Sequence, residues 1–287
     1  MSDPAELSPV ACAVCHAEDA ELRFEKQGLQ VVRCRRCGLF YVNPRLSMDA
    51  LRKLYNEQKI SDTFYYVRTA KDDAISFNKR LKLIERLRPP GRLLDVGCGP
   101  GTFLALAQKR GWKARGIDVN ATSVERCKAA GLDAVAGTFP HPELAGAKFD
   151  AIVLNDVIEH LTEPRAALQA VKEMLAPGGV MFISTPDVGS LVARMARSRW
   201  LHFKPVEHLT YFDRRTLARL LEEVGFEIVH SASIGRMRSL ALILERLSAY
   251  SPVMSKIGRA VVPSALAQRL SFPVDPGDEM AMLARLR

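Results

Sequence analysis

The sequence predicts an α/β fold: a mainly parallel sheet with helices on both faces, preceded by a small cysteine-rich module. Two observations predict the sheet. From residue 91 onward, short apolar runs alternate with amphipathic helical segments, and the first run leads into a glycine-rich turn. The module is predicted by two C-x-x-C pairs before residue 38. We therefore divide the chain into residues 1–46, a helical connector at 47–90 and an α/β domain at 91–287.

The first two segments have simple local patterns. Residues 29–33 and 39–42 are short β-like runs inside the cysteine-rich module. In the connector we expect a helix from 72 to 88, ended by Pro89-Pro90-Gly91. The apolar residues that it places at near-helical spacing are Ile75, Leu83, Ile84 and Leu87.

The α/β domain is predicted from its apolar runs and helix signals. Expected strands are 92–96, 113–117, 133–136, 149–154, 180–184, 226–230 and 279–285. Expected helices are 102–110, 123–130, 164–175 and one that Asp213 caps and Gly225 ends. Strands alternating with helices in this way indicate a mainly parallel sheet.

The glycine-rich turn is the strongest functional signal in the chain. It follows the first strand of the domain and reads Asp95-Val96-Gly97-Cys98-Gly99-Pro100-Gly101. Glycines allow a ligand to approach the backbone, and the helix N-terminus that follows favours negative charge. Asp95 at the strand end favours a ligand that carries an ammonium group over a pyrophosphate. Asp118, 23 residues later, ends the second strand, where a carboxylate can hold a ribose diol.

These motifs, with two more, resemble the class I S-adenosylmethionine-dependent methyltransferases over about residues 91–231. The four motifs that carry the resemblance, in order, are 95–101, Gly116-Ile117-Asp118, Asn155-Asp156-Val157-Ile158-Glu159-His160 and Leu175-Ala176-Pro177-Gly178-Gly179. The resemblance implies a Rossmann-like sheet of seven strands, of which the last is antiparallel. It also implies S-adenosylmethionine as the cofactor.

The resemblance further assigns residues to parts of the cofactor. The glycine loop and Asp95 would hold the methionine part, and Asp118 the ribose. Thr138 and Phe139 would flank the adenine, and the end of the fourth strand would lie beside the methionine and the substrate. The implied cofactor-binding residues are Asp95, Gly97, Gly99, Gly101, Asp118, Thr138, Phe139, Asn155 and Asp156. For Glu159 and His160 we favour a structural role over a catalytic one.

The paired cysteines predict a structural metal site. Eighteen residues separate Cys12-x-x-Cys15 from Cys34-x-x-Cys37, a spacing typical of four-thiolate zinc sites. Four thiolates close the coordination sphere, so the metal would not be catalytic. The alternative, a redox dithiol, is disfavoured because there are two pairs. The run from residue 33 to 45 also resembles the zinc ribbon of bacterial methyltransferases that act on sugars and polysaccharide precursors, and less closely that of ribosomal RNA methyltransferases.

The segment 198–212 follows the fifth strand, where an open α/β sheet binds its ligand. It contains a tryptophan, two histidines and several other aromatic residues. Glu207-His208 resembles the Glu-His pair of sugar C-methyltransferases, in which the histidine is the base. We interpret His208 as a general base that Glu207 orients. The alternative is that His208 and Tyr211 only pack the loop onto the sheet.

Residues 236–272 form an insert before the last strand. It mixes large apolar residues with arginines and lysine. Such a basic amphipathic segment can lie on a membrane, form a dimer face or cap the substrate pocket.

The bulk composition limits the class of protein and of partner. The formal charge of +9 fits an anionic partner: a phosphorylated substrate, nucleic acid or an anionic membrane surface. The N-terminal residues lack the apolar core of a signal peptide, so we expect a cytoplasmic protein. We leave the oligomeric state open.

The sequence therefore predicts methyl transfer from S-adenosylmethionine to a small-molecule acceptor, such as an anionic nucleotide-linked sugar or a polysaccharide- or lipid-pathway intermediate. One alternative is an RNA methyltransferase that uses the ribbon and the basic surface. The non-enzymatic alternative is a zinc-ribbon binding module with a vestigial cofactor fold. The acceptor atom is not determined by these patterns.

Overall fold

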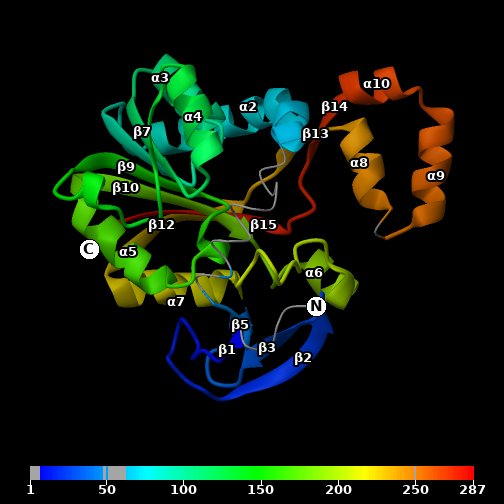
Figure 1. The fold of residues 1–287 in the computed structure, drawn as a ribbon, viewed down its shortest axis with the longest axis horizontal. Helices are drawn as coiled ribbons and strands as arrows, with labels where there is room; N and C mark the ends of the chain where they lie inside the picture. Colours follow the sequence, from blue (N-terminus) through cyan, green and yellow to red (C-terminus); the bar gives the residue numbers. More distant parts are fainter. Residues whose placement is uncertain (1–6, 48–49, 51–62, 249) are drawn as a thin grey trace.

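The chain is described here by a computed structural model covering residues 7–47, 50, 63–248 and 250–287, without the side chains of 63–67 (Figure 1). Its main element is a seven-stranded sheet in the order β12-β15-β10-β9-β6-β7-β8. The final strand β15 is antiparallel to both neighbours, and the other pairs are parallel. This confirms the predicted Rossmann-like methyltransferase sheet.

The strands of this sheet begin and end close to the predicted positions. They are β6 (Arg92–Val96), β7 (Lys113–Asp118), β8 (Asp133–Ala136), β9 (Phe149–Asn155), β10 (Leu175–Pro186), β12 (Phe226–Ser233) and β15 (Glu279–Leu286). The central strands are almost wholly buried, because helices cover both faces of the sheet.

Figure 1 shows the helices in two layers, one on each side of the sheet. One layer holds α2 (Thr63–Glu85), α3 (Thr102–Lys109) and α4 (Ala121–Ala129). The other holds α5 (Pro164–Met174) and α7 (Arg214–Val224). A capping box of Asp213 and Thr216 begins α7, and Gly225 ends it in the left-handed conformation, as its sequence predicts.

The connector helix α2 begins earlier than the predicted 72–88 and buries only part of the predicted apolar set, because Ile84 is buried and Leu83 half-buried while Leu87 lies beyond the helix end. The buried face also contains Arg80, which the prediction did not include. Ile75 and Leu87 are 40% and 47% exposed, whereas Arg80, Leu81 and Ile84 are completely buried. The apolar spacing missed this part of the face because a charged residue lies in the middle of it. Arg80 is accommodated there by polar groups at the ends of two strands, described below.

The N-terminal residues form a small antiparallel sheet below the main one in Figure 1. Its strands are β2 (Ala20–Lys26), β3 (Leu29–Cys34) and β4 (Phe40–Val42), and its fourth strand, β11 (Thr210–Tyr211), comes from the α/β domain. A two-stranded pair, β1 (Leu7–Ser8) with β5 (Arg45–Leu46), adjoins it. Sharing β11 makes the ribbon and the segment 198–212 one continuous structure.

Residues between β12 and β15 form a lobe at the right of Figure 1. It consists of β13 (Arg236–Ser239), α8 (Leu240–Leu247), α9 (Pro252–Val261), α10 (Ser264–Arg269) and β14 (Ser271–Val274). Strands β13 and β14 pair antiparallel at its base. Short helix α6 (Leu191–Ala196) follows β10. Among the described residues, no helix is both long and apolar enough to cross a membrane.

Candidate active site

The loop between β6 and α3 lies at the carboxyl edge of the parallel strands. Its first glycine, Gly97, has φ +72° and donates to the carbonyl of Ile117 at 2.7 Å. A Cβ there would come within 2.5 Å of Val157. Gly101 has φ +87°, and a Cβ would come within 2.5 Å of Leu132. Both positions therefore need glycine for the fold of the loop itself, in addition to any ligand.

Asp118, at the end of β7, holds this loop in place. Its Oδ2 accepts from the Gly99 N–H at 2.8 Å, and its Oδ1 accepts from the Asn120 N–H at 2.8 Å. Burial raises the pKa of the Asp118 carboxyl, and these two backbone bonds partly offset that rise. Each carboxylate oxygen can accept more than one hydrogen bond, so a ribose diol can still be held.

Asp95 and Arg80 are two buried ionisable side chains beside the loop, and each influences the other electrostatically. Asp95 is 1% exposed and Arg80 is 0% exposed. Burial and the nearby Asp118 raise the pKa of Asp95 well above its ordinary value, while Arg80 opposes the rise. Asp95 Oδ1 and Arg80 Nε and Nη2 have no hydrogen-bond partner among the described residues. Buried polar atoms are rarely left unpaired, so these atoms point to a ligand with both an acceptor and a donor.

The remaining donor of Arg80 joins it to the ends of β9 and β10. Its Nη1 donates to Asn155 Oδ1 at 2.8 Å and to Ser184 Oγ at 2.9 Å. Ser184 in turn donates to Asp156 Oδ1 at 3.0 Å. Asp156 has φ +57°, an uncommon conformation that aims its side chain at this network. The predicted residues Asn155 and Asp156 therefore lie together with Asp95.

Arg236, from β13 in the lobe, completes the network by contacting both Asp156 and Glu279. Burial alone would raise the pKa of Asp156, but Arg236 and Arg80 together hold it below its ordinary value. Asp156 is therefore ionised at neutral pH. The lobe contributes directly to the electrostatics of the site.

Thr138 and Phe139 follow β8 at the same edge of the sheet. Thr138 is exposed and Phe139 is half-buried against the core. The chain thus presents an exposed hydroxyl and the partly exposed ring of Phe139 beside the strand that neighbours Asp118. This position suits the adenine contacts that the sequence predicts.

Glu159, after β9, is buried with its carboxyl oxygen Oε2 accepting from Thr185 Oγ1 at 2.9 Å. Burial and the neighbouring Asp156 raise the pKa of Glu159 to about 8. Its backbone carbonyl accepts from the Leu209 N–H at 2.8 Å. These contacts tie the segment 198–212 to the sheet, which supports the structural interpretation of Glu159.

His160 and His208 lie next to Glu159. His160 Nδ1 is 2.9 Å from the Glu207 carbonyl oxygen, and the two imidazole rings meet edge to face with centroids 4.7 Å apart. Ring nitrogens of both histidines and a carboxyl oxygen of Glu159 all lie within 4.8 Å of one another. Burial lowers the pKa of both histidines, that of His208 strongly, so both rings are neutral at neutral pH.

The expected contact between Glu207 and His208 is not formed. The Glu207 carboxylate is 3.4 Å from Lys204 Nζ, and the Nδ1 of the buried His208 has no hydrogen-bond partner in the described structure. The backbone N–H groups of Glu207 and His208 both donate to the Lys204 carbonyl. This short turn directs the two side chains apart. Glu207 therefore contacts His160 through its carbonyl oxygen, and the charge of its carboxylate also raises the pKa of His160, in part offsetting the effect of burial.

Most aromatic residues of 198–212 pack the ribbon onto the sheet. Trp200, Phe203 and Tyr211 are nearly fully buried, and the ring of Phe203 lies 4.7 Å from that of Phe24 in β2. Trp200 Nε1 also donates to Asp278 at 3.0 Å. The packing interpretation holds for these residues, whereas His208 keeps an unpaired nitrogen.

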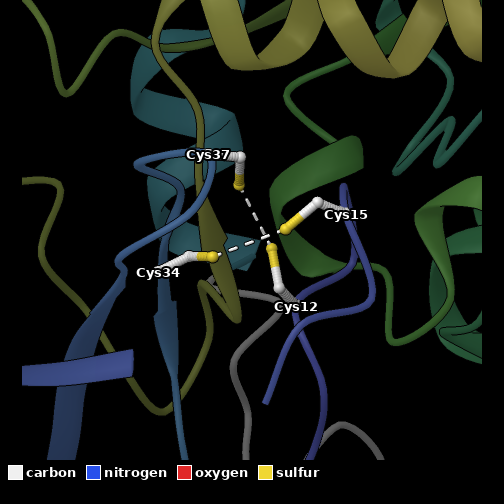
Figure 2. Close-up of side chains that lie close together, drawn as sticks. All are labelled: Cys12, Cys15, Cys34 and Cys37. Carbon is white, nitrogen blue, oxygen red and sulfur yellow. Dashed lines mark hydrogen bonds between the residues drawn. The ribbon is translucent and has the colours of Figure 1, made fainter. Parts of the chain in front are cut away.

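Figure 2 shows the four cysteines of the ribbon converging on one point. The sulfurs of Cys12 and Cys37 are 3.4 Å apart and those of Cys15 and Cys34 are 3.5 Å apart, and all four lie within 4.8 Å. These separations are far above a disulfide bond of about 2.05 Å. A tetrahedral zinc site with Zn–S bonds of about 2.3 Å has sulfur–sulfur distances of about 3.8 Å, and the observed separations are close to that value.

The two C-x-x-C turns have the same backbone geometry. His16 N–H donates to the Cys12 carbonyl at 2.9 Å, and Gly38 N–H donates to the Cys34 carbonyl at 3.0 Å. Both donors occupy the left-handed region, with φ +57° and +86°. The arginines Arg36, Arg215 and Arg219 line a small cavity beside Cys37. Four cysteine sulfurs that converge within 4.8 Å are the donor set of a structural zinc site, so these residues fit zinc.

Comparison with known proteins gives the family. The family model described as a methyltransferase domain matches residues 66–231, which include the glycine loop, Asp118 and the end of β9. The chain belongs to this methyltransferase family. The ubiquinone biosynthesis O-methyltransferase of Brucella anthropi is 36% identical over 100 residues, and that of a Chelativorans species is 33% identical over 100 residues. Each match covers 33% of this chain and only 40% of the relative.

Solved structures support the methyltransferase fold. A possible histamine N-methyltransferase of Thermotoga maritima, S-adenosylmethionine-dependent by its description, aligns with a TM-score of 0.54 and 16% identity. That alignment covers 83% of this chain and 100% of the other. An S-adenosylmethionine-dependent methyltransferase of Archaeoglobus fulgidus aligns with a TM-score of 0.52 and 20% identity, covering 77% and 99%. At these identities the likeness concerns the fold alone.

Sequence reasoning missed Arg80 and Arg236 in this methyltransferase domain. Arg80 lies between Phe77 and Ile84, on the stripe of α2 that packs inward. A single arginine within an apolar helix stripe could have indicated a buried site, because a charge there needs partners inside the protein. Arg236 gave no local signal, since its partners are 80 and 43 residues away in the chain.

Proposed function

We propose that this protein transfers a methyl group from S-adenosylmethionine to a small-molecule acceptor at the carboxyl edge of the sheet. The observation that carries the proposal is that buried Asp95 and Arg80, beside the glycine loop, each keep polar atoms without a hydrogen-bond partner among the described residues. A free amino acid end carries an ammonium and a carboxylate, which complement these two groups. Asp118, next to them, suits the ribose.

Each residue then has a defined task. Arg80 binds the carboxylate and Asp95 the ammonium of the methionine part, while Asp118 orients the sugar. When bound, S-adenosylmethionine supplies a methyl group on a positively charged sulfur. Asn155 and Asp156 border the place where the acceptor meets that methyl group, and His208 removes the acceptor's proton. Catalysis is mostly positioning, assisted by this base.

For the acceptor we propose a hydroxyl on a small anionic molecule, such as a nucleotide-linked sugar or a polysaccharide- or lipid-pathway intermediate. The names of the curated relatives support oxygen as the acceptor atom. The RNA alternative has less support, since two of the ribbon arginines contact protein groups: Arg35 lies 3.6 Å from Asp19, and Arg33 lies over the ring of Phe40. The vestigial-fold alternative leaves the buried Asp95 Oδ1 and Arg80 Nε without a hydrogen-bond partner among the described residues.

Mass spectrometry of reaction products tests the acceptor class. The protein should be incubated with S-adenosylmethionine and, separately, sugar nucleotides, small phenolic acids and bulk RNA. We expect enzyme-dependent methylation of a small hydroxyl compound and of no RNA. Methylated RNA without any small-molecule product would contradict the proposed acceptor while leaving methyl transfer intact.

We also propose that the four ribbon cysteines bind one structural zinc ion. Elemental analysis of protein purified without chelator should give one zinc per chain, and Cys34→Ser should lower that value and the melting temperature. Because β11 pairs with β4, amide exchange should rise at Thr210 and Tyr211 as well.

Cys127→Ser is the matched control for this experiment. Cys127 is also a buried thiol, but it donates to Gly99 in the cofactor loop and lies outside the cluster. The Cys127→Ser variant should keep one zinc per chain. Wild-type protein that folds without metal would refute the zinc site.

A further inference from the structure

Helix α9 turns its large apolar side chains outward. Its inner face is made of small residues: Ser255 Oγ donates to the Leu244 carbonyl at 2.7 Å, and Gly258 packs directly against the Leu244 side chain. The residues on its outer face are exposed by 58–74%, namely Val253, Met254, Ile257 and Val261. A surface helix ordinarily buries its large apolar residues, so this reversed arrangement indicates a surface that contacts something else.

Helix α6 extends this apolar surface. Leu191 and Met195 are 70% and 75% exposed. A shallow groove lined by Met195, Arg199 and Tyr250 connects α6 with the turn between α8 and α9. The backbone N–H of Leu201 lies 3.4 Å from the Tyr250 hydroxyl oxygen, so the two segments are in contact.

The two segments that form this surface are basic, and the acids at their edges are paired, Glu245 with Arg68 and Glu207 with Lys204. Residues 188–206 and 246–274 contain eight lysines and arginines and no aspartate or glutamate. They are Arg194, Arg197, Arg199, Lys204, Arg246, Lys256, Arg259 and Arg269. A second copy packed symmetrically on this surface would bring these like charges together. An anionic lipid surface instead satisfies both the apolar residues and the positive charge.

We propose that α6 and α9 form a docking surface that binds an anionic membrane. The apolar side chains of α9 enter the headgroup region, and the basic residues contact lipid phosphates. Because α6 directly follows β10, whose end borders the candidate active site, docking places the site close to the bilayer. The proposal goes beyond the methyl transfer proposed above and does not depend on it.

Vesicle co-sedimentation of the full chain tests the proposal. Wild-type protein should bind vesicles of phosphatidylcholine with phosphatidylglycerol, and bind phosphatidylcholine alone at least about tenfold more weakly, because several cations act together. High salt should weaken the binding. Ile257→Asp should lower the affinity about tenfold or more, since it replaces an inserted apolar group by a charge.

Leu22→Asp is the matched control. Leu22, on ribbon strand β2, is 59% exposed, against 58% for Ile257, and lies outside the docking surface. The Leu22→Asp variant should bind vesicles with the same affinity as the wild type. Equal binding by Ile257→Asp and wild type would overturn the proposal, as would no wild-type binding to anionic vesicles. A dimer in light scattering that Ile257→Asp dissociates, without vesicle binding, would overturn it in favour of a second copy.

Discussion

Replacing His208 by asparagine is expected to lower turnover by about 10²–10⁴-fold, the usual scale for losing a general base. S-adenosylmethionine affinity should change little, because His208 lies beside Glu159 and His160 and not in the glycine loop. Burial is the largest cause that lowers the pKa of His208 well below its ordinary value, and repulsion from His160 and His202 adds to it. The imidazole is therefore unprotonated and competent at neutral pH, and the acid limb of the wild-type rate should lie well below the ordinary imidazole pKa of about 6.5.

The pH profile separates catalysis from packing. The His208→Asn substitution should remove the acid limb of the rate profile, whereas a packing role for His208 would leave that limb in place. Because His160, His202 and His208 all have lowered pKa values in the fold, their contribution to stability is complete above about pH 6.5 and is lost as the pH falls below it. Melting temperatures must therefore be measured at each pH.

Tyr211→Phe is the control for this loop, since it removes an unpaired hydroxyl from a buried neighbour and keeps the ring. It should retain turnover within a few-fold. If His208→Asn also retained turnover within a few-fold, the base would have to be another group.

Arg80→Met is expected to weaken S-adenosylmethionine binding by about 10–150-fold, which corresponds to losing charged hydrogen bonds worth about 1.5–3 kcal/mol. The reason is that Arg80 is a buried cation whose Nε and Nη2 make no hydrogen bond among the described residues, although Nη2 lies 4.0 Å from Glu279 Oε2. Isothermal titration calorimetry measures the loss. Arg88→Met is the control, because Arg88 is half-buried on the same segment and pairs with Asp150 away from the loop.

A truncated ligand shows whether Arg80 acts on the carboxylate. Methylthioadenosine keeps the adenine and ribose but lacks the amino acid end. Its affinity should be nearly the same for wild type and Arg80→Met. An equal loss for both ligands would mean that Arg80 only supports the fold, by neutralising Asp156 and Glu279. Arg80→Lys, which keeps the charge, should fall between the two.

The main sheet could be predicted from the sequence because its signals are local. Each parallel strand is a short apolar run bounded by turn residues, and β6 and β8 begin and end at the predicted residues. The loop from Asp95 to Gly101 and the acid at 118 were visible for the same reason. Glycines at 97 and 101 reflect positive φ angles, which a glycine-rich turn signals locally, although Val157 and Leu132 also leave no room for a side chain there.

Contacts between distant segments could not be predicted in this way. The pairing of β11 with β4 joins residues about 170 positions apart, and two-residue strands carry no periodic pattern. The side-chain directions of Glu207 and His208 depend on a turn that a sequence pair does not reveal. Arg236 reaches the site only because the lobe folds back on β9 and β15.

Binding of S-adenosylmethionine to the wild-type chain tests the central claim most directly. Calorimetric titration of the zinc-loaded protein should show one S-adenosylmethionine bound per chain, with affinity lost in Asp118→Ala. Saturating ligand should also raise the melting temperature of the wild type. A folded wild-type protein that shows neither binding heat nor a higher melting temperature would contradict the cofactor site at Asp95, Asp118 and the glycine loop.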